Sequence, residues 1–152
     1  MRKVNVTKVE IVRECDNDPD TGYLGAYTSK PGPDNRTIDR EERGDMLRGE
    51  YRYFVAGEET RNPDSVEQDY QRMEGLSRGE WCYLGIYARV EVIVNGTVQT
   101  IRSPGLWGIE SDSSSAYFDE VAQDELDTLK GILSEMGIGT AIKLEDAELV
   151  QS

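Results

Sequence analysis

Three carboxylates at alternate positions near the beginning of the chain could together bind a cation. Asp16, Asp18 and Asp20 stand in the segment Asp-Asn-Asp-Pro-Asp-Thr-Gly, and closely spaced oxygen ligands are typical of calcium loops. The pattern then departs from a calcium loop, because Thr21 replaces the glycine of the sharp turn and Tyr27 replaces the bidentate glutamate. We therefore interpret the segment as a solvated acidic turn, and keep a small-ligand or cation site at residues 16–22 as an alternative.

Histidine is absent from all 152 residues, and this limits the catalytic chemistry available to the chain. Histidine is the side chain whose usual pKa lies nearest neutrality, so its absence excludes Ser-His-Asp and Cys-His nucleophiles and histidine-ligated zinc. Cys15 and Cys82 are the two cysteines, too few for a four-cysteine zinc site. We therefore predict a protein that is not an enzyme and that holds no cofactor.

An enzyme with a carboxylate, arginine or tyrosine site stays open as a second alternative. These side chains can transfer protons or bind charged substrates without histidine. A pocket that joined Asp39, Arg40 or Arg52 with Glu110 would support this alternative. The spacing in the sequence does not single out such a set.

The chain is strongly acidic, with a formal net charge of -13 and an isoelectric point of about 4.4. This charge repels nucleic acid and anionic membranes at long range, because both are polyanions. It also favours attraction to basic protein surfaces. We therefore expect a basic protein surface as the partner, with no direct binding to nucleic acid or membrane. Association with a second copy of the chain stays open.

The cellular location follows from two negative signals in the sequence. No apolar run reaches the roughly 20 residues that a membrane span needs. The basic start Met1-Arg2-Lys3 is not followed by the apolar stretch of a signal peptide. We therefore expect a cytoplasmic protein with reduced cysteines, and keep a disulfide between Cys15 and Cys82 as an alternative.

The acidic residues are concentrated in the last third of the chain. Residues 105–152 contain 11 acidic residues but only two basic ones, Lys130 and Lys143. This asymmetry predicts an acidic face that binds a basic partner. Its candidate residues are Glu110, Asp112, Asp119, Glu120, Asp124 and Asp127. The alternative is an ordinary solvated helix face, with acids favoured early in the helix by its dipole.

Two short aromatic segments resemble each other at four of five positions. Tyr23-Leu24-Gly25-Ala26-Tyr27 matches Tyr83-Leu84-Gly85-Ile86-Tyr87. Tyr23, Tyr27, Tyr83 and Tyr87 are therefore candidate aromatic contacts, since tyrosine offers a large contact area and a hydrogen bond. Tyrosines at alternate strand positions also serve as half-buried packing, which is the alternative interpretation.

The pattern of predicted strands and helices favours an α+β fold. Asn95-Gly96 separates two β-rich runs, which is typical of a tight hairpin, here over residues 80–103. Helices are expected over residues 62–75 and 113–136, where apolar residues recur at helical spacing. We expect both helices to pack on a mainly antiparallel sheet centred on the hairpin. The whole chain, residues 1–152, is expected to form a single domain.

Weaker signals complete the predicted layout. The alternation over residues 3–14 slips around residues 7–8, which predicts either one strand with a bulge or two short strands. Shorter strands are expected at 23–28 and 50–56, and a last short strand or a turn at 140–150. Residues 29–48 are polar and contain prolines and glycines, so we expect a long surface excursion there, with a helical turn near residues 39–45.

Several segments together resemble a known group of proteins. They are Asp18-Pro19-Asp20-Thr21 with Tyr23-Leu24-Gly25, Ile38-Asp39-Arg40, Gly49-Glu50-Tyr51-Arg52-Tyr53-Phe54, Asn62-Pro63-Asp64, Arg78-Gly79-Glu80-Trp81, and Gly105-Leu106-Trp107-Gly108-Ile109-Glu110-Ser111-Asp112. In these segments the chain resembles a group of small acidic hypothetical proteins of bacteria, phages and mobile elements.

This resemblance implies a biological setting and transfers no functional residues, because the group has no established activity. Small acidic proteins in that setting are often inhibitors of host defence, and some of them mimic the charge of DNA. Together with the charge distribution, the resemblance leads us to expect a non-catalytic protein-binding module. Its partner would be a host defence protein or a nucleic-acid-binding protein.

Overall fold

The computed structural model of the chain describes residues 4–30, 32, 35–38, 52–57, 62–139 and 142–152. It is an α+β protein with a mixed sheet, a separate three-stranded antiparallel sheet and two helices, which confirms the predicted fold class. The chain divides into two compact units. The first unit combines Met1–Pro19 with Cys82–Ser152, and the second is Asp20–Trp81. The expectation of a single domain stays a prediction.

The first unit is built on a mixed sheet of five strands. They are β1 (Val4–Cys15), β5 (Tyr83–Val94), β6 (Thr97–Arg102), β7 (Leu106–Glu110) and β8 (Glu148–Gln151). The order is β6-β5-β1-β8, and β7 also pairs with β5. β8 runs parallel to β1, whereas the other pairings are antiparallel. The long central strands β1 and β5 therefore carry the sheet.

Two local features of this sheet agree with the sequence analysis. Asn95 and Gly96 both have positive φ, 50° and 83°, as a tight turn between twisted antiparallel strands requires. This turn joins β5 to β6, which confirms the predicted hairpin. The register between β1 and β5 shifts between Val6 and Lys8, which confirms the predicted bulge.

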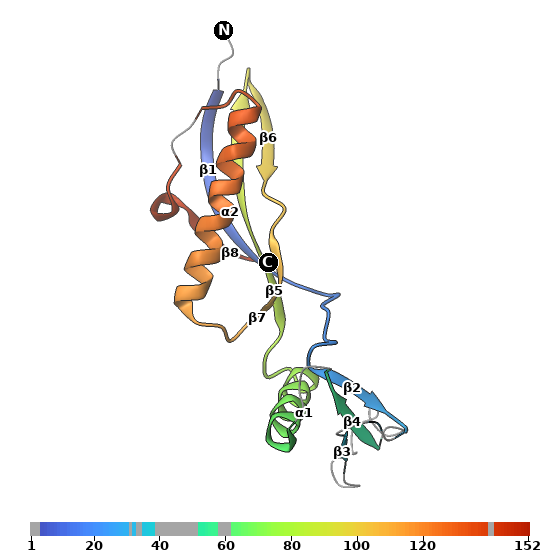
Figure 1. The fold of residues 1–152 in the computed structure, drawn as a ribbon. Helices are drawn as coiled ribbons and strands as arrows, with labels where there is room; N and C mark the ends of the chain where they lie inside the picture. Colours follow the sequence, from blue (N-terminus) through green and yellow to red (C-terminus); the bar gives the residue numbers. More distant parts are fainter. Residues whose placement is uncertain (1–3, 31, 33–34, 39–51, 58–61, 140–141) are drawn as a thin grey trace. The chain divides into compact units, whose positions relative to one another are not determined.

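The helix α2 (Ser115–Glu135) covers one face of this sheet (Figure 1). Ser114 caps it, because its side chain accepts a hydrogen bond from Tyr117 N at 3.2 Å. The apolar stripe of α2 is buried, and Gly137 follows the helix with a φ of +76°. The stripe consists of Phe118, Val121, Ala122, Leu126, Leu129 and Leu133. It packs on Ile11, Ile86, Ala88, Val90 and Val92 of the strands to form the main hydrophobic core.

The second unit is a smaller α+β arrangement. Its sheet has the order β2-β4-β3, with β2 at Gly25–Thr28, β3 at Asn35–Thr37 and β4 at Tyr53–Ala56. The helix α1 (Pro63–Ser77) begins after Asn62, whose side chain accepts a hydrogen bond from Ser65 N at 2.9 Å. Val66, Tyr70 and Met73 of α1 are buried, as their spacing predicted.

The packing of α1 corrects one detail of the predicted architecture. We expected α1 on the hairpin sheet, but it packs against β2, β3 and β4. The Phe54 and Tyr70 rings meet edge to face, with centroids 5.6 Å apart. Helical periodicity shows which face of α1 is apolar, and it does not show which sheet that face will cover.

The polar segment 29–48 and the C-terminal segment also differ in detail from the expectations. Asn35–Thr37 forms β3 within the segment that we expected to be a surface excursion. The helical turn expected near residues 39–45 lies outside the described residues. The expected final strand is present as β8, preceded by a short 3-10 helix at Leu144–Asp146. Neither of the two α-helices is both long and apolar enough to serve as a membrane-spanning segment in the described part of the chain.

Candidate interaction surface

The outer face of α2 carries the central acidic residues predicted from the sequence. Asp119, Glu120, Asp124 and Asp127 are all exposed, because the apolar stripe turns the opposite side of the helix toward the sheet. Glu120, Asp124 and Asp127 follow one another at spacings of four and three residues, so they lie in one row along the helix. We call these four residues the acidic face.

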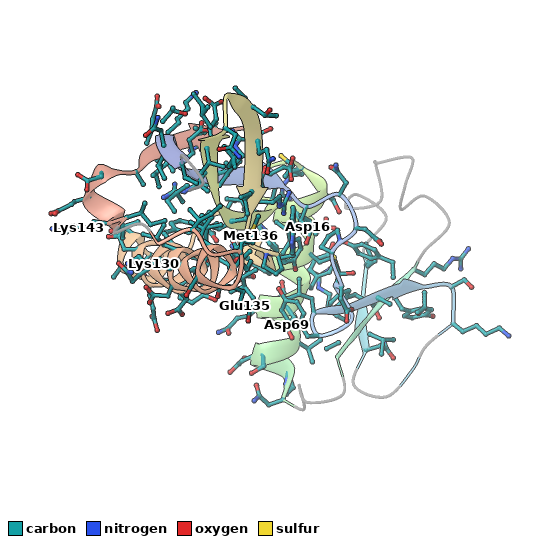
Figure 2. All side chains as sticks on the ribbon, turned by 90° about the horizontal axis from the view of Figure 1, so that it is seen from above. Asp16, Asp69, Lys130, Glu135, Met136 and Lys143 are labelled. Carbon is teal, nitrogen blue, oxygen red and sulfur yellow. The ribbon has the colours of Figure 1, made fainter. Side chains whose placement is uncertain are left out.

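The helix dipole does not account for the positions of these acids. Acidic residues stabilise a helix in its first turn, and the first turn of α2 contains none. Glu120 and Asp124 are like charges four residues apart, an arrangement that destabilises a helix. Glu135 lies in the last turn, where the dipole disfavours a negative charge (Figure 2). The distribution of acids on α2 therefore costs helix stability, which counts against the alternative of dipole-favoured placement.

Countercharge on the acidic face is sparse. Lys130 is the one basic residue of α2, and its Nζ lies 3.8 Å from Asp127 Oδ1. Asp127 also accepts a hydrogen bond from Gln123 Nε2 at 2.9 Å. Lys143 lines a hollow beside Asp119, but its Nζ is paired with Glu145 at 3.9 Å. The net charge of the face is therefore strongly negative.

Glu125 has a different role from its acidic neighbours, and the sequence analysis did not single it out. Its Oε1 accepts hydrogen bonds from Ser103 Oγ at 2.8 Å and from Gly105 N at 2.7 Å. Ser103 is fully buried, and its Oγ also accepts a hydrogen bond from Ala88 N at 2.9 Å. Glu125 therefore anchors α2 to the connection between β6 and β7.

Glu110 and Asp112 lie just before α2. Glu110 ends β7 and is half-buried, whereas Asp112 is exposed in the following turn. The Glu110 carbonyl accepts hydrogen bonds from Ser113 N at 3.0 Å and from Ser113 Oγ at 2.6 Å. The turn that leads into the helix is thus held by backbone contacts, and Asp112 extends the negative surface.

A second acidic feature of the first unit is a hollow next to Trp107. It has a volume of about 540 Å³ and is lined by Trp107 together with Glu14, Cys15, Asp16, Asn17, Asp18 and Ser152. Trp107 is 40% exposed, and its indole Nε1 donates a hydrogen bond to the Pro104 carbonyl at 3.2 Å. Cys15 is a free and exposed thiol, as is Cys82. An aromatic ring beside carboxylates is suited to hold an organic cation.

The three carboxylates of the predicted calcium-like segment are not gathered as metal ligands. Asp16 Oδ1 accepts a hydrogen bond from Asp18 N at 3.1 Å, and its Oδ2 accepts one from Gly108 N at 2.9 Å. Asp20 Oδ1 accepts from Gly22 N at 2.9 Å. The contacts to Asp18 N and Gly22 N form local turns, whereas the contact to Gly108 N ties the segment to β7. Among the described residues, no group of three or more Asp, Glu, Cys or His side chains could hold a metal ion.

The four candidate tyrosines have different surroundings. Tyr23 is 55% exposed, whereas Tyr83 and Tyr87 are only 2% and 5% exposed. Tyr87 packs beneath the Arg102 guanidinium, which lies 3.6 Å from the centroid of its ring. Tyr27 is half-buried, and its hydroxyl donates a hydrogen bond to Glu74 Oε2 at 2.5 Å. The tyrosines are thus distributed over both units, and only Tyr23 is largely exposed.

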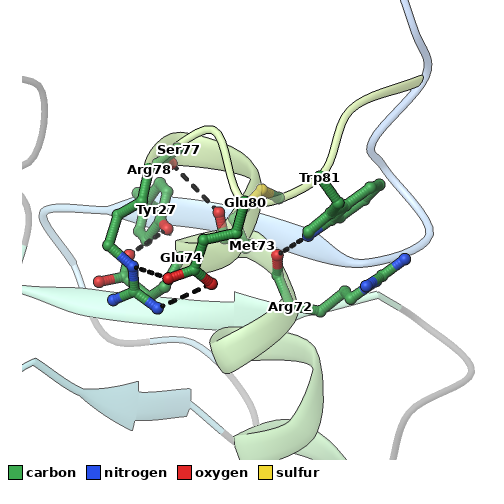
Figure 3. A network of polar contacts seen from close by, with 8 residues as sticks. All are labelled: Tyr27, Arg72, Met73, Glu74, Ser77, Arg78, Glu80 and Trp81. Carbon is green, nitrogen blue, oxygen red and sulfur yellow. Dashed lines mark hydrogen bonds and ion pairs between the residues drawn. The ribbon is translucent and has the colours of Figure 1, made fainter. Parts of the chain in front are cut away.

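A polar network holds the C-terminal end of α1 in the second unit (Figure 3). Glu74, which accepts the Tyr27 hydrogen bond, is only 4% exposed. Trp81 Nε1 donates a hydrogen bond to the Arg72 carbonyl at 2.8 Å, and the Arg72 guanidinium lies 3.7 Å from the Trp81 ring centroid. Arg78 pairs with Glu80 at 3.0 Å. The sequence analysis missed Glu74, although its position four residues after Tyr70 places it on the buried face of α1.

The polar and charged groups of this network are paired with one another, so the network stabilises the second unit. Arg36 extends the same pattern, because its Nε pairs with Glu67 at 2.7 Å while the guanidinium covers the Tyr70 ring at 3.9 Å. Two of the four residues considered for an enzymatic pocket are described, Arg52 in the second unit and Glu110 in the first. Asp39 and Arg40 lie outside the described residues, and Arg52 is exposed.

No protein family model, curated protein or solved structure matches this chain.

Proposed function

We propose that this chain is a non-catalytic binding protein whose acidic face docks on a basic protein surface. The observation that carries the proposal is the row of exposed carboxylates on α2, placed where they weaken the helix. Charges that reduce the stability of their own helix are consistent with a role in binding. The hydrophobic core accounts for the inner side of α2 and leaves its outer side available to a partner.

The physical basis of the docking is long-range attraction followed by specific contact. Charges that are aligned on one face raise the association rate with an oppositely charged surface, and this effect falls as salt is added. Individual exposed ion pairs contribute little, so several carboxylates must act together. The expected interaction is therefore fast, salt-sensitive and dependent on the acidic face as a whole.

The proposal extends to the setting implied by the resemblance. A basic surface that binds nucleic acid offers the charge that the acidic face needs, so the proposed partner is a nucleic-acid-binding protein of the host, such as a defence protein. The protein would act as its inhibitor by occupying that surface. This proposal places the chain in the cytoplasm.

The test compares two triple variants that have the same net charge. Glu120→Gln, Asp124→Asn and Asp127→Asn neutralise the acidic face. Glu145→Gln, Asp146→Asn and Glu148→Gln neutralise three exposed acids outside it and serve as the matched control. Binding to a fluorescent oligolysine peptide and to a folded lysine-rich protein is measured at increasing salt.

We expect the acidic-face variant to bind the lysine-rich protein at least about tenfold more weakly than the control, with a shallower dependence on salt. Equal weakening in the two variants would mean that net charge alone drives the association, and the proposal would then be wrong. The oligolysine peptide reports the general electrostatic contribution, since it has no fixed surface to match.

A second candidate function rests on the hollow beside Trp107. Glu14, Asp16 and Asp18 line it together with the exposed indole, a combination that suits a quaternary or methylated ammonium group. Calorimetric titration of the chain with tetramethylammonium tests this function. We expect binding that Trp107→Leu abolishes. Heat from Ca²⁺ without heat from tetramethylammonium would instead support the inorganic cation site considered for residues 16–22.

A further inference from the structure

A cavity lies between the beginning of α2 and the edge of the sheet formed by β1 and β8. Its volume is about 180 Å³. The walls are mainly apolar and include Ile11 and Ile86 from the strands, Phe118 and Ala122 from α2, and Ala147 and Leu149 from the C-terminal segment. The cavity lies wholly within the first unit. It is distinct from the acidic face, apart from Asp119 at its lining.

Arg13 of β1 is the one cationic side chain that lines this cavity. Its guanidinium lies 4.5 Å from the centroid of the Phe118 ring. Its Nε is fully enclosed and has no hydrogen-bond partner among the described residues. An enclosed donor without an acceptor costs free energy, and the cost is larger for a charged group. Arg13 therefore places a charged guanidinium group, one nitrogen of which is enclosed and unpaired, at the wall of a mainly apolar cavity.

Two other arginines with partly buried side chains are each paired with a carboxylate. Arg89 pairs with Glu10 at 3.2 Å, and Arg36 pairs with Glu67 at 2.7 Å. With 30 acidic residues in the chain, a carboxylate for Arg13 would be easy to supply. Asp119 also lines the cavity, but it forms no ion pair with Arg13 within 4.0 Å in the described structure. Arg13 is thus the exception among these three arginines.

We propose that this cavity binds a small organic anion, a monocarboxylate with an apolar tail about as large as a benzene ring. Apolar cavities of about 150 Å³ hold benzene, so the walls provide room for such a tail. The Arg13 guanidinium supplies the donor for the carboxylate, since arginine matches carboxylate geometry and forms strong charge-assisted hydrogen bonds. Phe118 packs against the guanidinium, and both side chains line the cavity.

Asp119 determines how tightly the anion binds. Its negative charge at the cavity opposes that of a carboxylate ligand, because like charges repel more strongly in a partly desolvated site. Replacement by the neutral isostere in Asp119→Asn is therefore expected to strengthen anion binding several-fold. The same substitution removes a charge from the acidic face and would weaken the proposed docking. The two proposals thus predict opposite effects for one variant.

Calorimetric titration of the full chain with benzoate tests the proposal, with benzamide as the uncharged control of similar shape. We expect benzoate to bind and benzamide to bind at least about tenfold more weakly, because only benzoate brings a charged acceptor. Arg13→Met should reduce benzoate binding to the level of benzamide. Arg78→Met removes the same charge from an exposed site in the second unit and should leave benzoate binding unchanged.

Ala147→Phe places a bulky apolar side chain at the cavity while Arg13 itself is kept, and keeps the test informative if Arg13→Met does not fold. It should abolish benzoate binding while the chain stays folded by circular dichroism. The proposal is overturned if benzoate does not bind, if it binds no better than benzamide, or if it binds Ala147→Phe as well as the unmodified chain. None of these outcomes bears on docking of the acidic face, which is measured separately with the lysine-rich protein.

Discussion

The carboxylate of Glu125 and the hydroxyl of Ser103 join α2 to the end of β6 by a hydrogen bond of 2.8 Å. The same Glu125 oxygen accepts Gly105 N at 2.7 Å, so one side chain holds two donors. Hydrogen bonds to a charged partner are stronger than neutral ones. This contact distinguishes Glu125 from Asp127, whose contacts with Gln123 and Lys130 lie within α2 itself.

Glu125→Ala should destabilise the fold, since it leaves the buried Ser103 hydroxyl and the Gly105 amide without their acceptor. The expected loss is about 2 kcal/mol or more in the free energy of unfolding. Urea denaturation followed by circular dichroism measures it. The adjacent exposed residue provides the control, because Asp124→Asn should change the free energy by no more than about 0.5 kcal/mol. Equal losses in the two variants would contradict the anchoring role.

Neutralising the row of acids should stabilise α2. Glu120→Gln with Asp124→Asn removes a pair of like charges four residues apart. Such a pair destabilises a helix by about 0.2–0.5 kcal/mol. We expect a small rise in the melting temperature at low salt that disappears at high salt, as screening removes the repulsion. Thermal unfolding at several salt concentrations checks this. A fall in melting temperature would show that the row stabilises the helix.

The Glu10 and Arg89 side chains form an ion pair across β1 and β5, where Glu10 is only 6% exposed. The hydrogen bond that Arg89 donates to the Glu10 carboxylate raises the pKa of Arg89 above its usual value. A cation whose pKa is raised on folding stabilises the fold at every pH below its unfolded pKa, and this contribution is lost only as pH rises through the folded value. For an arginine, that window lies far above neutrality.

Arg89→Met should therefore reduce the free energy of unfolding by about 1–3 kcal/mol, because the largely buried Glu10 carboxylate loses its closest partner. Lys8 would remain 3.9 Å from Glu10. The difference in the free energy of unfolding between Arg89→Met and the unmodified chain should be constant between about pH 7 and about pH 9. Urea denaturation across this range measures it. A difference that shrinks within the range would contradict the assignment to Arg89.

Trp107 lies directly on Gly85 of β5, and the absence of a side chain there makes this contact possible. A Cβ built on Gly85 would lie 2.1 Å from Trp107 Cε3. Gly85→Ala should displace the indole and destabilise the fold by about 1–3 kcal/mol, as overpacking does. Gly131→Ala is the control, since nothing lies within 4 Å of a Cβ at that helical position. It should stabilise α2 by about 0.5–1 kcal/mol. Thermal unfolding should therefore show a lower melting temperature for Gly85→Ala and a higher one for Gly131→Ala than for the unmodified chain.

The features that the sequence determined by itself are local ones. Asn95-Gly96 defines the hairpin because both residues tolerate positive φ, and Asn62 and Ser114 begin the helices because their side chains cap free amides. The charges that α2 turns outward follow from its apolar stripe in the same way. Each of these depends on interactions over a few residues, so the order of residue types is enough to predict them.

Which of several similar residues has a particular role depends on long-range packing. Asp124 and Glu125 are adjacent acids, yet one is exposed and the other holds Ser103, because β6 brings Ser103 to the helix from a distant part of the chain. Arg13 forms part of a cavity because β8 pairs beside β1 in parallel, across more than a hundred residues. Such contacts depend on which surfaces pack together, and neither spacing nor residue type specifies that choice.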